Sequence, residues 1–287
     1  MNRDYHVHSN YSDGTFLPWM VSAAAEAGLD AVGIADHCTV TDRDGPKRHR
    51  RAFGFALDIT YERRRRAIRE ARERHDIAVY DAAEMDYHPA DEGAIAEFLD
   101  GAGFDYALGS VHELDGTNVH TEPHFADQPE ADLRGHVDTY FDRLVALAES
   151  ELFEIAAHVD LVERNRHLRG FATEDHYRRA AEAFADSRTV PELNAGRALS
   201  EYGEVHPTPA FMEVLREAGV EFVFGTDSHR PGEIADRKEE LEKFAVSHGV
   251  ETTALGENGG RFSVRTTTRV VWPTHNGSST GWSGWRR

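Results

Sequence analysis

Short apolar stretches alternate with longer amphipathic or charged stretches along most of this 287-residue chain. The apolar stretches predict strands at residues 5–8, 31–35, 77–83, 106–111, 153–157, 189–193 and 221–225. The patterns around them predict helices at residues 17–27, 58–75, 92–101, 131–150, 173–185, 208–218 and 233–248. Repeated strand–helix units cross over with a right hand and build a parallel sheet. Seven such strands predict a closed α/β barrel of the TIM type that is one unit short. An open, doubly wound sheet is the alternative, although no Gly-x-Gly-x-x-Gly follows a strand.

The segments outside this alternation are expected to be irregular. Residues 39–54 are polar and residues 115–129 are rich in His, Pro and Gly, which predicts two long loops. No domain boundary is visible, so we expect residues 1–265 to form a single domain. Residues 266–287 are polar, Gly/Ser-rich and dotted with Trp, and we expect an unstructured tail that folding and activity do not need. Charges four residues apart within 58–75 predict a helix with a solvated face.

The charge balance restricts the partners of this chain. It carries 51 acidic and 32 basic residues, for a net charge of -19, and its lysines are Lys47, Lys238 and Lys243 alone. An acidic, Arg-rich surface indicates adaptation to high salt, with a GC-rich genome as the alternative cause. Its field repels nucleic acid and anionic membranes, whereas local arginines can still hold a small anionic substrate.

The sequence also favours a cytoplasmic protein. Cys38 is the only cysteine, which excludes a disulfide framework and a thiolate metal cluster. We find no signal-peptide region and no apolar run of about 18 residues, so no membrane span is expected. Nothing in the sequence predicts the oligomeric state.

Metal-ligand residue types follow six of the seven predicted strands. They are His6 and His8, His37, Glu84, His112, His158, and Asp227 with His229, and Asp13 lies in the first loop. The carboxyl ends of barrel strands meet on one face, so we expect these side chains to lie together. Nine ligands are too many for one tetrahedral ion. We therefore predict two or three divalent ions, of Zn, Mn or Fe, that share Glu84 as a bridging carboxylate.

Several motifs together resemble the PHP (polymerase and histidinol phosphatase) superfamily. They are His6-Val7-His8, Ser12-Asp13-Gly14-Thr15, Ala35-Asp36-His37, Ala83-Glu84-Met85-Asp86, Gly109-Ser110-Val111-His112, Ala157-His158-Val159-Asp160-Leu161 and Gly225-Thr226-Asp227-Ser228-His229. The resemblance spans residues 4 to about 250. It implies a distorted (β/α)7 barrel and a metal-dependent phosphoesterase. It also implies one ion at His6, His8, Glu84 and Asp227, a second at Glu84, His112 and His158, and a third at Asp13, His37 and His229.

Within the superfamily, the chain is most similar to the stand-alone histidinol-phosphate phosphatases. The segments 110–112, 192–197 and 205–209 carry this closer resemblance, which implies hydrolysis of L-histidinol phosphate in histidine biosynthesis. The chain departs from that group at Asp13, where many members have histidine, and at His206, where tyrosine is frequent.

The roles that we assign follow from phosphate-ester chemistry. Hydrolysis needs charge neutralisation and a nucleophile, which paired metals supply; Glu84, Asp227 and His229 are the expected catalytic residues. Arginine matches phosphate geometry, so Arg164 and Arg197 are the expected phosphate contacts. We further expect Asp36 and Asp160 to orient ligand imidazoles. The residues considered for contact with the rest of the substrate are Asp86, His88, Glu113, His120, His124 and Glu201.

Three other functions remain open from the sequence. The first is a PHP-type phosphoesterase for nucleotides or other small phosphate esters. The second is an amidohydrolase-type C–N hydrolase, in which a carbamylated lysine commonly bridges two metals; here no lysine ends a predicted strand. The third is a non-catalytic metal-binding module, which the loss of ligands would indicate, and no ligand is lost.

Overall fold

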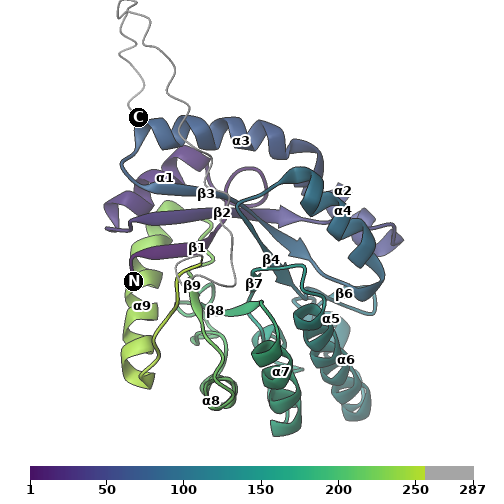
Figure 1. Cartoon of the computed structure of the whole chain (residues 1–287). Coiled ribbons are helices and arrows are strands. Elements are labelled where there is room, and N and C mark those ends of the chain that lie inside the picture. Colours follow the sequence, from purple (N-terminus) through teal and green to yellow (C-terminus); the bar gives the residue numbers. More distant parts are fainter. Residues whose placement is uncertain (256–287) are drawn as a thin grey trace, which may run out of the picture.

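The computed structural model describes residues 1–255, which form a nearly closed parallel barrel (Figure 1). Its sheet has the order β1-β2-β3-β4-β7-β8-β9. The strands are β1 (Arg3–Val7), β2 (Ala31–Cys38), β3 (Ala78–Asp86), β4 (Tyr106–Ser110), β7 (Ile155–Ala156), β8 (Val190–Asn194) and β9 (Val223–Gly225). A small antiparallel hairpin, β5 (Glu113–Leu114) with β6 (Thr117–Asn118), follows β4. This confirms the predicted α/β barrel with seven strands.

The two ends of the sheet meet directly after β1 and β9. Val7 bridges Ser228 in parallel, and the His8 amide donates to the Ser228 carbonyl at 2.9 Å. The Asp227 amide donates to the His6 carbonyl at 2.7 Å. Barrel closure therefore places the first and last ligand motifs side by side.

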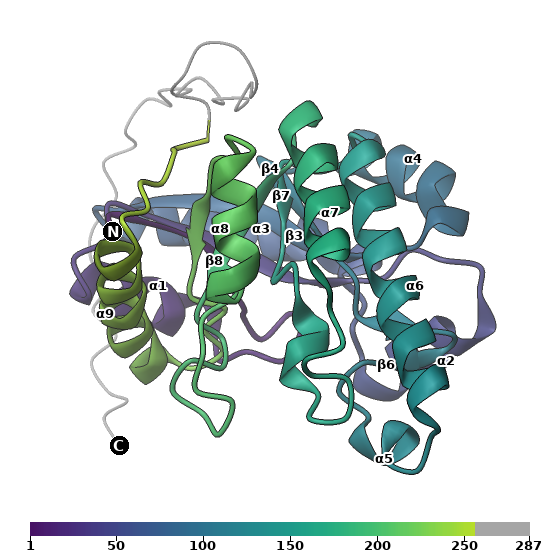
Figure 2. The same cartoon turned by 90° about the horizontal axis from the view of Figure 1, so that it is seen from below.

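Helices cover the outside of the barrel (Figures 1 and 2). The described helices are α1 (Leu17–Glu26), α2 (Asp44–Phe53), α3 (Leu57–Arg74), α4 (Glu92–Ala102), α5 (Glu122–Phe125), α6 (Glu130–Glu149), α7 (Glu174–Asp186), α8 (Pro209–Glu217) and α9 (Pro231–His248). Two 3-10 turns, η1 (Pro89–Asp91) and η2 (Leu161–Arg164), complete the described elements. Helix α6 shows why such segments fold as they do, because it buries one stripe: Val137, Tyr140, Phe141, Leu144, Leu147 and Ala148. Spacings of three and four residues place these side chains on one face.

Tyrosines fill the barrel interior near the amino ends of the strands. Tyr5 and Tyr106 pack edge to face with ring centroids 5.6 Å apart, and the Tyr106 hydroxyl donates to the Tyr5 carbonyl. Gly33 leaves room for that hydroxyl, since a Cβ at this position would overlap it. Apolar packing thus supports the barrel from one end and leaves the carboxyl ends of the strands for polar side chains.

The structure corrects the prediction of long loops at two places. Residues 39–54 contain α2, which is so polar and buries so little, only Pro46, that its segment resembles a loop. Pro46 in the first turn and Gly54, left-handed at φ 73°, mark its ends. Residues 115–129 contain β6 and the short α5. The predicted tail, residues 266–287, and its boundary lie outside the described residues.

Helix α3 is not solvated along its whole charged face. Arg64 is fully buried, with Nη1 3.0 Å from Asp36 Oδ2 and Nη2 2.8 Å from Asp81 Oδ1. A buried guanidinium is tolerated because carboxylates on the strands pair with it. The expectation of a wholly solvated face was wrong at this residue.

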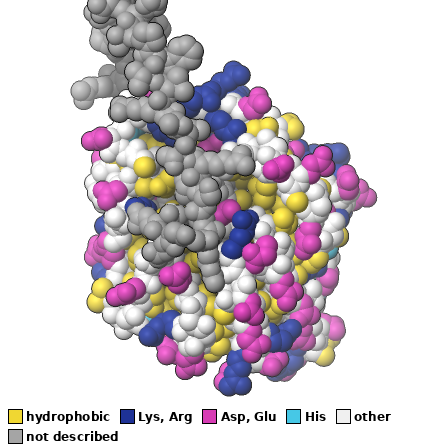
Figure 3. All heavy atoms as spheres, in the orientation of Figure 1, with side chains coloured by type: hydrophobic (Ala, Val, Ile, Leu, Met, Phe, Trp, Pro, Cys, Tyr) yellow, Lys and Arg dark blue, Asp and Glu magenta, His cyan; other side chains and the backbone are white. Residues whose placement is uncertain are grey.

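The outer surface agrees with the composition. Figure 3 shows Asp and Glu side chains spread over the visible face, with Lys and Arg between them. Among the described helices, none is both long enough and apolar enough to cross a membrane.

Candidate metal centre

All nine predicted ligands lie together at the carboxyl ends of the strands. We call this group the floor; it comprises His6, His8, Asp13, His37, Glu84, His112, His158, Asp227 and His229. Parallel strands bring residues far apart in sequence to one edge, and barrel closure joins the first to the last.

The first predicted ligand group converges on one oxygen of Glu84. His6 Nε2 and His8 Nε2 lie 3.4 and 3.5 Å from Glu84 Oε2, and the two nitrogens are 3.0 Å apart. Asp227 Oδ1 lies 3.3 Å from His8 Nε2. Four potential ligand atoms therefore surround one small volume.

The second predicted group converges on the other oxygen of Glu84. His158 Nε2 and His112 Nε2 lie 3.0 and 3.4 Å from Glu84 Oε1, and they are 3.2 Å from each other. The two oxygens of one carboxylate thus face two separate groups of imidazoles, which is the arrangement that a bridging ligand requires.

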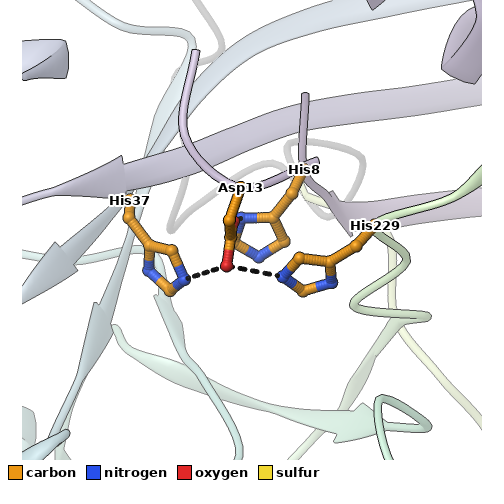
Figure 4. A group of neighbouring side chains, drawn as sticks. All are labelled: His8, Asp13, His37 and His229. Atoms are coloured by element: carbon orange, nitrogen blue, oxygen red, sulfur yellow. Dashed lines mark ion pairs between the residues drawn. The ribbon is translucent and has the colours of Figure 1, made fainter. Parts of the chain in front are cut away.

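The third predicted group lies around Asp13 (Figure 4). Asp13 Oδ2 is 3.3 Å from His229 Nε2 and 3.6 Å from His37 Nε2. The structure adds His8 to this group, because its Nδ1 lies 3.5 Å from Asp13 Oδ1. His37 also faces the centre, with Nδ1 2.8 Å from Glu84 Oε2.

The hydrogen bonds around the floor leave lone pairs pointing inward. His6 Nδ1 donates to both oxygens of Glu192 at 3.0 Å, so its Nε2 carries the lone pair. His112 Nδ1 donates to Asp86 Oδ1 at 2.7 Å, which leaves His112 Nε2 in the same state. Glu84 Oε2 is buried and accepts no well-aligned hydrogen bond, although His37 Nδ1 lies 2.8 Å away. Converging imidazole lone pairs and carboxylate oxygens repel one another unless a cation lies between them, so the residues present fit divalent ions such as zinc.

Burial and mutual charge shift the acidities within the floor. Burial opposes ionisation of Glu84, but the neighbouring imidazoles of His37, His6 and His112 hold the pKa of its carboxyl well below the usual range. Burial lowers the pKa of His158 to about 4, although Glu84 opposes this shift. An ionised carboxylate beside a neutral imidazole is the protonation state that metal ligation needs.

Two floor residues have backbone conformations that side chains rarely adopt. His158 has φ 29° and Asp227 has φ 53°, both in the left-handed region. Gly196 approaches Asp227 so closely that a Cβ there would overlap the carboxylate. Such strain persists where surrounding contacts impose it, and it occurs often at functional sites.

Arg164 lies beside the floor and is held by two partners. Its Nε donates to His206 Nε2 at 2.8 Å, and its Nη2 donates to Asn194 Oδ1 at 2.7 Å. The same Nη2 is 3.5 Å from Asp227 Oδ2, and the side chain is 7% exposed. Arg197 lines the same cavity but is exposed, and within the described residues its guanidinium has no ion-pair partner. The structure thus places both predicted phosphate contacts at the cavity. Arg164 is buried and fixed by hydrogen bonds, whereas Arg197 is exposed.

The carboxylates that orient floor imidazoles are not the two that we expected. Asp160 accepts from His206 Nδ1 at 2.5 Å. It therefore orients the histidine that contacts Arg164, and not a histidine of the floor. Asp36 accepts from the amide and hydroxyl of Ser9, at 2.6 and 2.7 Å, and from Arg64.

Glu192 and Asp86 contact the imidazoles instead. Sequence reasoning assigned no orienting role to either residue, although Asp86 lies two residues from Glu84. A signal for Glu192 was present too, since a carboxylate inside an otherwise apolar strand needs a partner.

Seven of the nine floor residues, all except His6 and His8, line the bottom of a cavity of about 720 Å³. Its other lining residues come mainly from α2, the β5–β6 hairpin and the segments after β8 and β9. Of the predicted substrate contacts, Asp86, Glu113 and His120 line the cavity, whereas His88, His124 and Glu201 are absent from its lining. A volume of this size suits a small-molecule substrate.

Comparison with known proteins identifies the family. Residues 4–196 match the model of the PHP domain, so this chain belongs to the PHP domain family. A protein of Deinococcus radiodurans described as "Probable histidinol-phosphatase" is 27% identical over 240 residues, covering 82% of this chain and 88% of that protein.

Two solved structures share the fold. The histidinol phosphate phosphatase of Lactococcus lactis, complexed with zinc, L-histidinol and phosphate, has a TM-score of 0.68 at 20% identity and covers 92% of this chain and 97% of its own. A candidate histidinol phosphatase from Listeria monocytogenes has a TM-score of 0.66 at 18% identity, covering 81% and 97%. These likenesses agree with the (β/α)7 barrel that the sequence motifs implied.

Proposed function

We propose that this protein is a metal-dependent phosphatase that hydrolyses L-histidinol phosphate to L-histidinol and inorganic phosphate. The observation that carries the proposal is Glu84, whose two oxygens face two groups of imidazole nitrogens. Membership of the PHP family and the curated relative in Deinococcus radiodurans support the same activity.

The floor would hold two or three divalent ions. His6, His8, Glu84 and Asp227 fit one ion, Glu84, His112 and His158 a second, and Asp13, His37 and His229, with His8 beside them, a third. Such ions neutralise phosphate charge and make a water molecule nucleophilic at neutral pH. Zinc suits these imidazole and carboxylate ligands, and manganese or iron would too.

The protein's own residues bind and position the phosphate. Arg164 is fixed by His206 and Asn194, so its guanidinium reaches the cavity in one orientation and needs little ordering when the substrate binds. Arg197 adds a second positive charge from the exposed side. Asp227 lies between Arg164 and His8, which couples the phosphate contact to the floor.

The remaining part of the substrate would face acidic groups at the cavity mouth. Glu113 lines the cavity and pairs with Arg43 at 2.6 Å, and Asp86 lies beside His112. Either carboxylate can attract the ammonium group of an amino alcohol. This gives a physical reason for preferring histidinol phosphate over a simple aryl phosphate.

A lysine-bridged C–N hydrolase receives no support from the described residues. Lys47 on α2 pairs with Asp42 at 2.7 Å, and Lys238 and Lys243 on α9 pair with Glu242 and Glu239 at 2.9 Å. None of the three lines the cavity. Glu84 occupies the bridging position instead.

Phosphate release by the zinc-loaded protein tests the proposal. We expect kcat/KM for L-histidinol phosphate to exceed that for p-nitrophenyl phosphate by about 10² or more, because the amino alcohol adds contacts in the transition state. Equal kcat/KM values would contradict L-histidinol phosphate as the preferred substrate, but they would still support a phosphatase activity. No release from any ester, after metal content has been verified, would contradict both.

A further inference from the structure

One side of the cavity is built from aromatic rings that the catalytic floor does not use. We call this side the aromatic wall; it comprises His49 and Phe53 on α2 and Phe55 just after it. Ring centroids are 4.5 Å apart for His49 and Phe53, 5.8 Å for Phe53 and Phe55, and 6.1 Å for His49 and Phe55. All three rings line the cavity, so they form one continuous surface.

Folding of the chain does not account for this surface. Phe53 is 63% exposed, and Pro46 is the only residue that α2 buries. Isolated exposed apolar residues are common, but a cluster that lines a polar cavity marks a ligand-binding surface. The aromatic wall therefore has unused contact area, and this area faces the space above the floor.

Ion pairs at both ends of α2 hold the wall in position. Arg43, just before the helix, pairs with Asp91 at 2.9 Å and with Glu113 on β5 at 2.6 Å. Arg50 near the other end pairs with Asp58 on α3 at 2.5 Å. Helix α2 is thus fixed to the β5–β6 hairpin and to α3, and these contacts fix the orientation of the rings before a ligand arrives.

The wall begins directly beside the floor. The ring of Phe55 stacks on His37, with centroids 5.1 Å apart and an angle of 26° between the planes. His37 Nδ1 lies 2.8 Å from Glu84 Oε2, at the centre of the floor. A group that follows the wall outward from the floor therefore meets Phe55 first and then Phe53. This geometry suits a ligand whose flat ring lies a few bonds from its phosphate.

We propose that the aromatic wall selects phosphate esters whose alcohol carries a planar aromatic or heteroaromatic ring a few bonds from the ester oxygen, and that Phe53 is a specificity-determining residue. The inference rests on the proposed phosphatase activity and adds the residues that recognise the leaving alcohol. Flat rings gain from stacking on aromatic faces in a way that branched aliphatic groups of similar size do not. The imidazole of histidinol phosphate belongs to the favoured class.

The test compares two esters on two variants of the full-length, zinc-loaded protein. L-Histidinol phosphate and L-leucinol phosphate share the amino-alcohol phosphate but differ in the ring. We expect Phe53→Leu, which keeps apolar volume and removes the ring, to lower the ratio of their kcat/KM values about tenfold. Phe16→Leu is the matched control, since Phe16 is also exposed, at 56%, and lies outside the cavity lining; it should keep the wild-type ratio.

A second measurement needs no turnover. Calorimetric titration with L-histidinol should show binding to Phe53→Leu about tenfold weaker than to Phe16→Leu. A wild-type protein that hydrolyses neither ester would refute the phosphatase proposal, and the inference with it. If the protein hydrolyses both esters and Phe53→Leu changes the ratio of their kcat/KM values less than twofold, the phosphatase proposal stands. The selective role of the aromatic wall is then refuted.

Discussion

The floor and the aromatic wall of the cavity are built in opposite ways. Floor side chains come from the ends of barrel strands or the first loop, and most are buried among fixed partners. The wall comes from an inserted helix that buries one residue and exposes a phenylalanine. The barrel thus fixes the groups that perform the chemistry, whereas an inserted segment supplies the surface that selects the substrate. Such a division is common in barrel enzymes, in which loops vary over a constant scaffold.

Replacing Arg164 and Arg197, one at a time, should separate the ordered side of the cavity from its exposed side. We expect Arg164→Ala to lower kcat/KM for every phosphate ester by about 10² to 10³, because a fixed charge-assisted contact is lost. Arg197→Ala should cost about tenfold, since an exposed side chain must be ordered at each binding event. Steady-state kinetics on both variants, each with unchanged metal content, measures the difference. Equal losses would show that the order of Arg164 has no catalytic value.

Removing the negative charge of Glu192, which contacts His6, should weaken metal binding by the floor and leave the aromatic wall unchanged. Glu192 holds the imidazole of His6 through Nδ1. We expect Glu192→Gln to weaken zinc binding about ten- to a hundredfold, the usual effect of losing a carboxylate that orients a ligand histidine. Competition with a chelator measures the affinity, and Glu26→Gln on the exposed face of α1 is the control. Unchanged affinity would mean that the orientation of His6 does not depend on this carboxylate.

The smallest expected effect concerns Glu163, the residue before Arg164, whose carboxylate accepts from the Gly170 amide. Burial, with a smaller contribution from the charge of Asp160, raises the pKa of Glu163 to about 7. The folded protein then holds a proton that the unfolded chain has released above its ordinary pKa of 4.5, so this group makes stability fall between pH 4.5 and 7. We expect Glu163→Gln to unfold at a higher temperature than wild type at pH 8, by about 1 kcal/mol in stability, and to lose this advantage at pH 5. An advantage of the same size at both values would show that the charge of Glu163 is not its cause.

The strand ends of the floor could be predicted from sequence because one rule places them. Parallel strands carry their carboxyl ends to one edge, so residues such as Glu84 and His158, 74 positions apart, had to be neighbours. The position of Glu84 between two groups of histidines also followed from the motifs, whose order matches the PHP family along the chain.

The partners of these ligands could not be read from local spacing. His6 and Glu192 are 186 residues apart, and nothing near either residue indicates that they pair. Asp36 lies near the carboxyl end of β2 and Asp160 follows β7, but Asp36 is bound by serine and arginine, and Asp160 by His206. Helix α2 escaped prediction because it carries few apolar residues, buries only one of them and rests on ion pairs instead.

The metal content of the Glu84→Ala variant is the decisive test of a metal centre bridged by Glu84. In the proposed centre, the two oxygens of Glu84 serve two ions, whereas His229 serves a single ion. Elemental analysis of purified wild-type, Glu84→Ala and His229→Ala proteins should therefore show the largest loss of bound metal in Glu84→Ala, with at least two ions per chain in the wild type. Glu84→Ala protein that keeps the wild-type metal content would contradict the bridged centre.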